Sequence, residues 1–337
     1  MIEPVTDVVD APVAPAISGL VFRTFRDESD LPLIVAISNA CKAADRIEEV
    51  DTVEGMQGRF QPSDNFDPQR DAFVVEIDGV AVAFGRLWWR AEDSGARVYL
   101  HGGGVRPDWR RKGIGRALFR LKERRLRDIA AAHPKDVPRF FQVFMADTET
   151  GSEALARSEG YAPVRRFFTM VRPTLDDLPE APLPHGLEVR PVLPEHYRMI
   201  WAGIHEAFRD HWGAFPATEW HYRNWLNDPS FDPTLWKVAW DGEQVAGVVL
   251  GVINAAENER FQRRRGWLEK VAVRRPWRQR GLARALIAVT LRALEGRGMA
   301  EAALGVDTEN LSGALRLYES AGFHVAERFS AYRKPVD

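Results

Sequence analysis

Val105-Arg-Pro-Asp-Trp-Arg-Arg-Lys-Gly-Ile-Gly-Arg-Ala-Leu118 recurs, little changed, as Val273-Arg-Arg-Pro-Trp-Arg-Gln-Arg-Gly-Leu-Ala-Arg-Ala-Leu286. The glycines at 113 and 281 are 281 − 113 = 168 residues apart, which is the spacing of whole domains rather than of solenoid repeats. Each copy passes from an apolar strand-like stretch through a basic glycine turn into a helix. The start of such a helix exposes N–H groups that bind anions. The sequence therefore predicts two related domains, each with an anion site.

The resemblance extends beyond the glycine turns. Leu20-Val-Phe-Arg-Thr-Phe is echoed by Leu187-Glu-Val-Arg-Pro-Val, 187 − 20 = 167 residues later. A helix is predicted after each of these strands, at about 31–45 and 195–208. A hairpin follows each helix, with Asp78-Gly79 or Asp241-Gly242 at its turn. A strand at 301–306, a helix at 310–320 and a strand at 325–333 complete the second copy. This order of strands and helices is typical of an α/β fold with a mixed α+β sheet.

A proline-rich stretch separates the two copies. It contains Pro173, Pro179, Pro182 and Pro184, and prolines at this density interrupt regular structure. We therefore expect a flexible leader at 1–18, a first domain at 19–172, a linker at 173–185 and a second domain at 186–337.

Composition excludes several classes of function. The net charge of −2 over 337 residues argues against a nucleic-acid-binding protein. Cys41 is the only cysteine, so we expect neither an internal disulfide nor a cysteine-based metal site. The sequence holds no apolar stretch long enough for a membrane span and no pattern of a signal peptide. We expect a cytoplasmic protein, a monomer or homodimer, that binds no metal, nucleic acid or membrane.

Three stretches of the second copy identify a family: Val271-Ala-Val273, the turn from Arg278 to Ala283, and Asn310 with Ala314-Leu-Arg-Leu-Tyr318-Glu-Ser-Ala-Gly-Phe323. Together they resemble the GNAT superfamily of acetyl-CoA-dependent N-acyltransferases. The resemblance covers the second half nearly end to end and weakens in the first half after its glycine turn. It implies two tandem GNAT-like domains, a layout similar to that of mycothiol synthase. A helix start with surface arginines is the structural alternative for a single turn of this kind, but two copies in matching context favour an anion site.

The resemblance also implies which residues bind acetyl-CoA. In the second copy, the strand backbone would pair with the pantetheine arm, the turn amides would hold the pyrophosphate and Asn310 would hold the cofactor arm. In the first copy, the glycine turn alone is preserved, which predicts cofactor binding without efficient catalysis. The cofactor-binding candidates are Val271, Ala272, Val273, Arg278, Gln279, Arg280, Gly281, Leu282, Ala283, Arg284 and Asn310, with Val105, Arg110, Arg111, Lys112, Gly113, Ile114, Gly115 and Arg116 in the first copy.

Two residues of the second copy are candidates for catalysis. An alkylamine is mostly protonated at neutral pH, so its attack on a thioester needs a base. Glu269 is two residues before Val271, on the same face of the predicted strand, and is the candidate for a base acting through water. Tyr318 matches the family tyrosine that protonates the leaving thiolate. A strand-end ion pair and a core aromatic are the structural alternatives for these two residues.

The first copy lacks both catalytic candidates. His101 stands at the position of Glu269, since 269 − 168 = 101. Two alignments remain open for Tyr318, because one places Ala156 there and the other Ser158. Neither of these side chains replaces a phenol, whereas His101 is either a base or a packing residue.

The segment after the first helix of the second copy is the candidate acceptor site. In the superfamily this region lines that site, and here it holds Asp210, His211 and Trp212. A helix–loop packed by tryptophans is the structural alternative. We expect an enzyme that acetylates a primary amine of a small molecule. The alternatives are a cysteinyl aminosugar acceptor, a coenzyme-A-binding regulatory module and a protein-lysine acetyltransferase.

Overall fold

The computed structural model describes residues 8–178, 180–310 and 313–336. Residues 1–7 of the expected leader, Pro179 of the expected linker, the start of the helix expected at 310–320 and the last residue lie outside the described residues. Among the described residues, none of the helices combines the length and hydropathy needed to cross a membrane.

The chain forms two compact units, and each is a mixed α/β sheet with helices on both faces. Unit 1 comprises residues 1–164 and 330–337, and unit 2 comprises residues 165–329. This division differs from the expected one, because the boundary precedes the proline-rich stretch and the last residues return to unit 1. The strands β6 (Ala162–Arg172) and β12 (His324–Pro335) both cross the boundary.

Unit 1 has the strand order β1-β2-β3-β4-β5, with the end of β12 beside β5. Neighbouring strands are antiparallel except for β4 and β5, which are parallel. The strands are β1 (Leu20–Thr24), β2 (Ala72–Ile77), β3 (Val80–Ala91), β4 (Arg97–Val105) and β5 (Arg139–Ala146); the helices are α1 (Leu31–Asp45), α2 (Val53–Arg59), α3 (Pro68–Asp71), α4 (Ile114–Ala131) and α5 (Thr150–Ser158).

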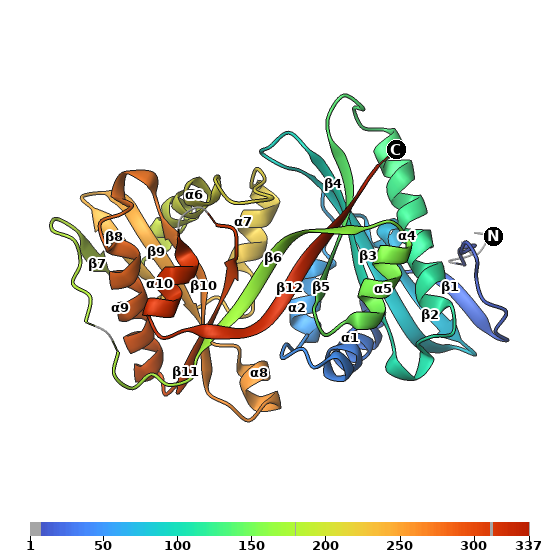
Figure 1. Cartoon of the computed structure of the whole chain (residues 1–337), viewed down its shortest axis with the longest axis horizontal. Helices are drawn as coiled ribbons and strands as arrows, with labels where there is room; N and C mark the ends of the chain where they lie inside the picture. Colours follow the sequence, from blue (N-terminus) through green and yellow to red (C-terminus); the bar gives the residue numbers. More distant parts are fainter. Residues whose placement is uncertain (1–7, 179, 311–312, 337) are drawn as a thin grey trace. The chain divides into compact units, whose positions relative to one another are not determined.

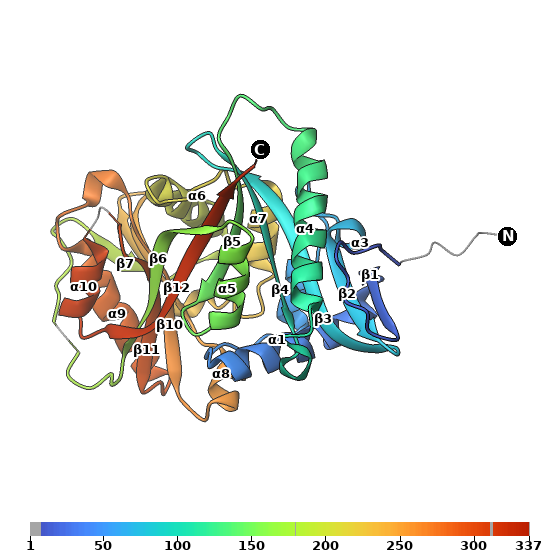
Figure 2. The same ribbon diagram turned by 45° about the vertical axis from the view of Figure 1, so that its right-hand side comes forward.

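Two hydrophobic clusters cover the faces of the unit 1 sheet. One cluster joins α4 and α5 to the sheet, and the other joins α1 and α2 to it. Figure 2 shows α4 running along its face of the sheet. The side chains of β3 alternate between these clusters, since Leu87 belongs to the first and Phe84 to the second.

Residues 8–18 pack against unit 1, although a flexible leader was expected there. The N–H of Val9 donates to the carbonyl of Phe22 at 2.8 Å, and Ala11 is buried in the α4 cluster. Apolar residues in this segment therefore contribute to the core of the unit.

Unit 2 repeats this plan. Its strand order is β7-β8-β9-β10-β11-β6, with β10 and β11 parallel and the other printed pairs antiparallel. The helices α9 and α10 lie on one face and α6 and α7 on the other (Figure 1). The strands are β7 (Glu188–Arg190), β8 (Lys237–Asp241), β9 (Gln244–Val252), β10 (Arg265–Val273) and β11 (Glu301–Asp307); the helices are α6 (Tyr197–Phe208), α7 (Glu219–Leu226), α8 (Ala255–Arg260), α9 (Leu282–Gly296) and α10 (Ala314–Ser320).

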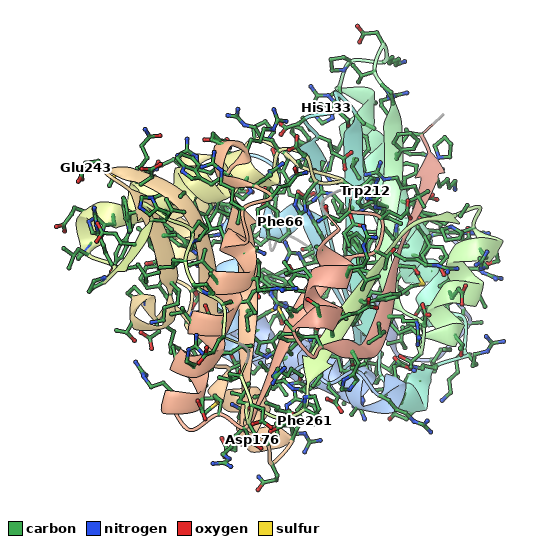
Figure 3. The ribbon with its side chains drawn as sticks, turned by 60° about the vertical axis from the view of Figure 1, so that its left-hand side comes forward. Phe66, His133, Asp176, Trp212, Glu243 and Phe261 are labelled. Carbon is green, nitrogen blue, oxygen red and sulfur yellow. The ribbon has the colours of Figure 1, made fainter. Side chains whose placement is uncertain are left out.

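Both expected hairpins form, one of them with a different turn. In unit 1 the turn residues are Asp78 and Gly79, both at positive φ. In unit 2 Asp241 pairs with Gln244, so the two-residue turn is Gly242-Glu243 rather than Asp241-Gly242. Figure 3 labels Glu243 at the tip of this hairpin. Both hairpins have a β-bulge at the equivalent place, between Val75 and Glu76 in unit 1 and between Ala239 and Trp240 in unit 2. The bulge is therefore shared, and the two hairpins differ in where the Asp-Gly pair falls relative to the paired residues.

Candidate active site

The two glycine turns have the same backbone conformation. A short 3-10 turn precedes each one, at Pro107–Trp109 in unit 1 and at Arg275–Trp277 in unit 2. Arg111 and Gln279 have φ of 63° and 60°, and the glycines Gly113 and Gly281 have φ of 88° and 82°. The helices α4 and α9 begin at the next residue. In both units the turn therefore presents a helix N-terminus of the kind that binds phosphate oxygens.

Arg110 and Arg278 hold these turns in place and do not point into them. In unit 2 the Nε of Arg278 donates to the Val273 carbonyl at 3.0 Å, and its Nη1 lies 2.9 Å from Asp210. In unit 1 the Nε of Arg110 donates to the Val105 carbonyl at 3.2 Å, and both terminal nitrogens contact Asp45 at 2.7 Å. These two arginines differ from the expected phosphate ligands, because an aspartate at the end of the first helix neutralises each guanidinium.

The contact with Arg278 gives Asp210, which was expected in the acceptor site, a structural role instead. Its carboxylate pairs with both Arg275 and Arg278, and these guanidinium groups hold its pKa well below the usual range. Asp210 therefore links the end of α6 to the glycine turn. The side chains of Arg116 and Arg284 are likewise engaged, donating to Ser158 at 3.3 Å and to Ser320 at 3.0 Å. The backbone amides of the turn remain the main candidates for holding an anion.

The pairing of β10 with β11, the two central strands of unit 2, ends where β10 has a β-bulge. The parallel pairing of β10 with β11 ends at Leu268 and Leu304. The bulge lies between Leu268 and Lys270, so Glu269 is the extra residue. Beyond it, the segment Val271–Val273 pairs with β9 on its other side. The inner edge of this segment is therefore available to an extended ligand, which can add to it as a strand does.

Tyr318 lies on α10, beneath this part of the sheet. It is 6% exposed and belongs to the same core cluster as Leu282 at the start of α9 and Leu304 on β11. Its hydroxyl makes no hydrogen bond to the described part of the chain. Burial raises its pKa to about 12. The phenol is therefore protonated at neutral pH and has a proton to donate.

Polar groups gather on the α6 face of β10. Glu269 is half exposed, and its carboxylate is 3.1 Å from the Nζ of Lys270. The buried Nε2 of His205, on α6, has no hydrogen-bond partner among the described residues. Burial lowers the pKa of His205, and the nearby His221 and Lys270 lower it further. This imidazole is therefore neutral at neutral pH. The sequence analysis missed it, because no local motif marks a histidine within an amphipathic helix.

His211 lies near one of these polar groups, and Trp212 is the next residue. Burial lowers the pKa of His211, and Lys270 is among the charged groups near it. The ring of Trp212, labelled in Figure 3, is 6.0 Å from the ring of Phe167 on β6. Of the three expected acceptor-site residues, His211 therefore lies near Lys270, whereas Asp210 pairs with the arginines of the glycine turn and Trp212 packs near Phe167. Asn310 follows β11, and its N–H donates to the Asp307 carbonyl at 3.2 Å.

The profile of the Acetyltransferase (GNAT) family matches residues 37–135 and 199–323. These two segments make up more than half of the chain, and each contains one glycine turn. The chain belongs to the GNAT acetyltransferase family. It is therefore an acetyl-CoA-dependent N-acetyltransferase with tandem GNAT units.

Proteins named mycothiol acetyltransferase are similar along most of this GNAT chain. The one from Geodermatophilus obscurus is 27% identical over 305 residues, covering 88% of this chain and 92% of its own length. The one from Thermomonospora curvata is 32% identical over 254 residues, covering 73% and 76%.

Solved GNAT structures share the fold. A GCN5-related N-acetyltransferase from Sphaerobacter thermophilus has a TM-score of 0.70 at 28% identity, covering 95% of this chain and 96% of its own. A tandem GNAT protein from the clavulanic acid biosynthesis pathway has a TM-score of 0.67 at 17% identity, with coverages of 94% and 98%.

The first GNAT unit lacks the groups that surround Glu269 and Tyr318. Its β4 pairs with β3 without a bulge from Arg97 to Val105. His101, which the 168-residue offset sets against Glu269, pairs with Leu87 as Leu268 pairs with Gly251, so the bulge residue Glu269 has no counterpart in unit 1. The His101 side chain is buried, with its Nε2 3.0 Å from the Tyr161 hydroxyl. Burial lowers the pKa of His101 well below its usual value. His101 is therefore a packed core residue here.

The structure settles which residue of unit 1 stands opposite Tyr318. Ser158 and Ser320 each donate to the carbonyl three residues earlier at 2.7 Å, and each accepts from the arginine of its glycine turn. These two serines are therefore equivalent, and 320 − 158 = 162. The same offset places Ala156, which is fully buried, at the position of Tyr318. Unit 1 has no phenol at this position.

Proposed function

We propose that unit 2 transfers the acetyl group of acetyl-CoA to a primary amine of a small molecule by direct attack. The observation that carries this proposal is the buried Tyr318, whose protonated hydroxyl lacks a partner among the described residues. Its side chain belongs to the same core cluster as Leu282, at the start of α9, and Leu304, where the pairing of β10 with β11 ends. Unit 1 has Ala156 at this position, so the chemistry belongs to unit 2.

The cofactor would lie between β10 and β11. Its pantetheine arm would pair with the backbone of Val271–Val273, whose inner edge is free of β11. The amides of Gln279–Arg284 would hold the pyrophosphate at the start of α9. Asn310 would hold the cofactor arm, as the resemblance implies. We assign Arg278 to fixing the shape of the turn rather than to contacting phosphate.

The reaction needs two proton transfers. Glu269, acting through a water molecule, would take a proton from the ammonium group of the acceptor. The neutral amine would attack the thioester carbonyl, forming the C–N bond while the N–H near Val271 stabilises the oxyanion. The C–S bond would then break, and Tyr318 would donate its proton to the thiolate. The proton lost by the attacking nitrogen returns the phenol to its starting state.

The acceptor would enter on the α6 face of the sheet. There His205 and His211 supply hydrogen-bonding groups near Lys270, and Trp212, beside Phe167, would supply apolar surface. A cysteinyl aminosugar is the favoured acceptor class, because relatives named mycothiol acetyltransferase align along nearly the whole chain. A coenzyme-A-binding module and a protein-lysine acetyltransferase are the competing functions. Free thiol release measured with a panel of amines, aminosugars and peptides separates them, and activity on peptides alone would contradict the small-molecule proposal.

Replacing Tyr318 by phenylalanine tests the proposal directly. General acid catalysis is worth about 10²–10⁴-fold, so Tyr318→Phe is expected to lower kcat by about 10² or more. The Kd of acetyl-CoA, measured by calorimetry, is expected to stay unchanged. Tyr332→Phe is the matched control, because this buried tyrosine of unit 1 donates to Glu153 at 2.8 Å. An unchanged kcat for Tyr318→Phe would rule out the acid role.

A further inference from the structure

Arg86 of unit 1 lies within a cage of aromatic rings. It points from β3 toward α1 and α2, the face that also holds Phe84. Its guanidinium carbon is 4.8 Å from the ring centre of Phe66 and 4.6 Å from that of Trp88. The ring of Phe60 is a third neighbour, at 5.6 Å. Rings against the flat faces of a guanidinium leave its N–H edge as the side that can donate hydrogen bonds.

This cation has no counter-ion in the described part of the chain. Its Nε is buried and unbonded, and no described carboxylate forms an ion pair with it. The charged group that acts on it is another cation, Arg59. Burial lowers the pKa of Arg86 to about 10, so it stays charged at neutral pH. A largely buried charge without a partner is costly. Such a charge is kept where a ligand compensates it, as in a site that exists to bind an anion.

Room for a ligand remains beside Arg86. On the neighbouring strands its direct partners are Ala72 and Gly102, neither of which carries a large side chain. A Cβ built on Gly102 would meet no atom within 4 Å. By contrast, a Cβ on Gly104, two residues along the same strand face, would meet the Cys41 sulfur at 2.7 Å. This face of β4 is therefore open at Gly102, opposite Arg86, and closed at Gly104.

The second unit shows what Arg86 replaces. Strand pairing aligns Gly102 with Lys270, which is 168 residues later and faces Leu250 on β9. Arg86 therefore corresponds to Leu250, on the same sheet face that carries the acceptor-side groups of unit 2. In unit 2 a lysine lies opposite a leucine; in unit 1 a glycine lies opposite an arginine. The cation has moved to the neighbouring strand, and the position across from it has been left open.

We propose that unit 1 binds a small oxyanion, a carboxylate or phosphate group, through the N–H edge of Arg86 in the space beside Gly102. A planar guanidinium binds such groups through two parallel hydrogen bonds. Arg59, held at 2.8 Å by Asp51, adds positive charge to the same site. The site does not depend on acetyl transfer in unit 2, and it makes unit 1 a ligand-binding unit rather than an inert copy.

Thermal unfolding of the full chain tests this proposal. Inorganic phosphate and acetate are titrated separately at constant ionic strength, with chloride as the balancing ion. A ligand that binds the folded state raises Tm with its concentration, so at least one probe is expected to raise the Tm of the wild type. Because the glycine turns can also bind phosphate, only the part of the rise that Arg86→Gln loses is assigned to Arg86. Loss of this part with phosphate alone would identify a phosphate site, and loss with acetate alone a carboxylate site. A Tm that stays constant with both probes at millimolar concentrations would overturn the proposal.

Variants separate binding from structural support. Arg86→Gln is expected to lower the rise in Tm with the anion, because the glycine turns are left intact, and to leave Tm in anion-free buffer unchanged or higher, because the unpaired charge is gone. Arg70→Gln, a change at an exposed arginine of α3, is the matched control and should keep the full rise. A lower Tm for Arg86→Gln in anion-free buffer together with an unchanged anion effect would show a purely structural arginine.

A spectroscopic measurement on the wild type covers the case in which Arg86→Gln fails to fold. The buried Nε–H of Arg86 should give a slowly exchanging arginine signal in a nitrogen-edited NMR spectrum. Arg86→Lys identifies this signal by its loss. A saturable shift of the signal with phosphate or acetate supports the site. A signal that does not move with either probe overturns it.

Discussion

Two potential bases lie near Lys270 on β10 of unit 2. Glu269 is half exposed and 3.1 Å from the ammonium group of Lys270. His205 is neutral and its Nε2 is buried without a described partner. A base that acts through water needs access to solvent, which favours Glu269. A buried, neutral imidazole is better suited to orienting the acceptor.

Replacing each of these two side chains in a separate variant distinguishes the role of base from the role of orienting the acceptor. Glu269→Gln is expected to lower kcat by about 10²-fold, as for loss of a general base, with little change in the KM of the acceptor. His205→Asn is expected to raise that KM and to leave kcat nearly constant. Steady-state kinetics with saturating acetyl-CoA measure both effects. The opposite pattern would transfer the base role to His205.

Lys122 makes the stability of unit 1 depend on pH. Its ammonium group is buried and donates to the Gly102 carbonyl at 2.8 Å. Burial lowers its pKa from 10.5 to about 7. Between these two values the unfolded chain holds a proton that the folded chain has lost. Raising the pH through this window therefore favours the folded state.

The corresponding experiment compares the wild type with Lys122→Met. The free energy of unfolding of the wild type, relative to the variant, is expected to rise from pH 7 to pH 10. Both proteins are unfolded with urea across that range, so that other titrating groups cancel in the difference. A difference that is constant with pH would show that Lys122 is not buried as a cation.

At the scale of the element, each unit has a glycine turn that is held by an arginine–aspartate ion pair. Asp210 and Asp45 hold the two turns through Arg278 and Arg110. If unit 2 alone carries the chemistry, the same change in the two copies should have different consequences. Asp210→Asn is expected to raise the KM of acetyl-CoA about tenfold, because Arg278 loses the charged hydrogen bond that holds it against the turn.

Asp45→Asn is the matched control, because it loosens the turn of unit 1. The acetyl-transfer kinetics of this variant are expected to equal those of the wild type. Equal losses of activity in both variants would mean that the turn of unit 1 also takes part in the reaction.

The helices and turns were largely predictable from the sequence, whereas the ion pair between Arg278 and Asp210 was not. The helix at 31–45 and the glycine turns follow from local patterns of apolar residues, glycine and charge. The ion pair of Arg278 joins residues 68 positions apart, so the arginine was expected to contact phosphate. The turn of the second hairpin is displaced by one residue, because the pairing of Asp241 with Gln244, and not the Asp-Gly dipeptide, decides which residues form it.

At the scale of the whole molecule, the end of the chain belongs to the unit that the start of the chain builds. Residues 330–337 are part of unit 1. Arg333 donates to Gln142 at 2.7 Å, and Lys334 lies 2.7 Å from the buried Glu123. The sequence suggested a division at the prolines, because prolines mark breaks in local structure. The last strand completes the sheet of unit 1 through long-range pairing, and a local sequence pattern does not predict such pairing.

Truncation after Phe329 tests the importance of this last segment. Loss of Lys334 deprives buried Glu123 of one partner, and Glu153 loses Tyr332. The expected cost to unit 1 is about 3 kcal/mol or more, as for breaking a buried ion pair. Calorimetry should show unit 1 unfolding at a lower temperature, while the transition of unit 2 changes less. Lys334→Gln should give a smaller shift in the same direction. An unaltered first transition would contradict a structural role for the segment.

The return of the last residues to unit 1 also sets an order of events during synthesis. The ribosome completes residues 1–164 first, then makes all of residues 165–329, and only then the segment that fills the sheet of unit 1. At roughly 5–20 residues per second this interval lasts on the order of ten to thirty seconds. During that time the edge of β5 is open to pairing with other nascent chains. The edge is therefore closed only after residues 330–337 have been made, and not when the first half folds.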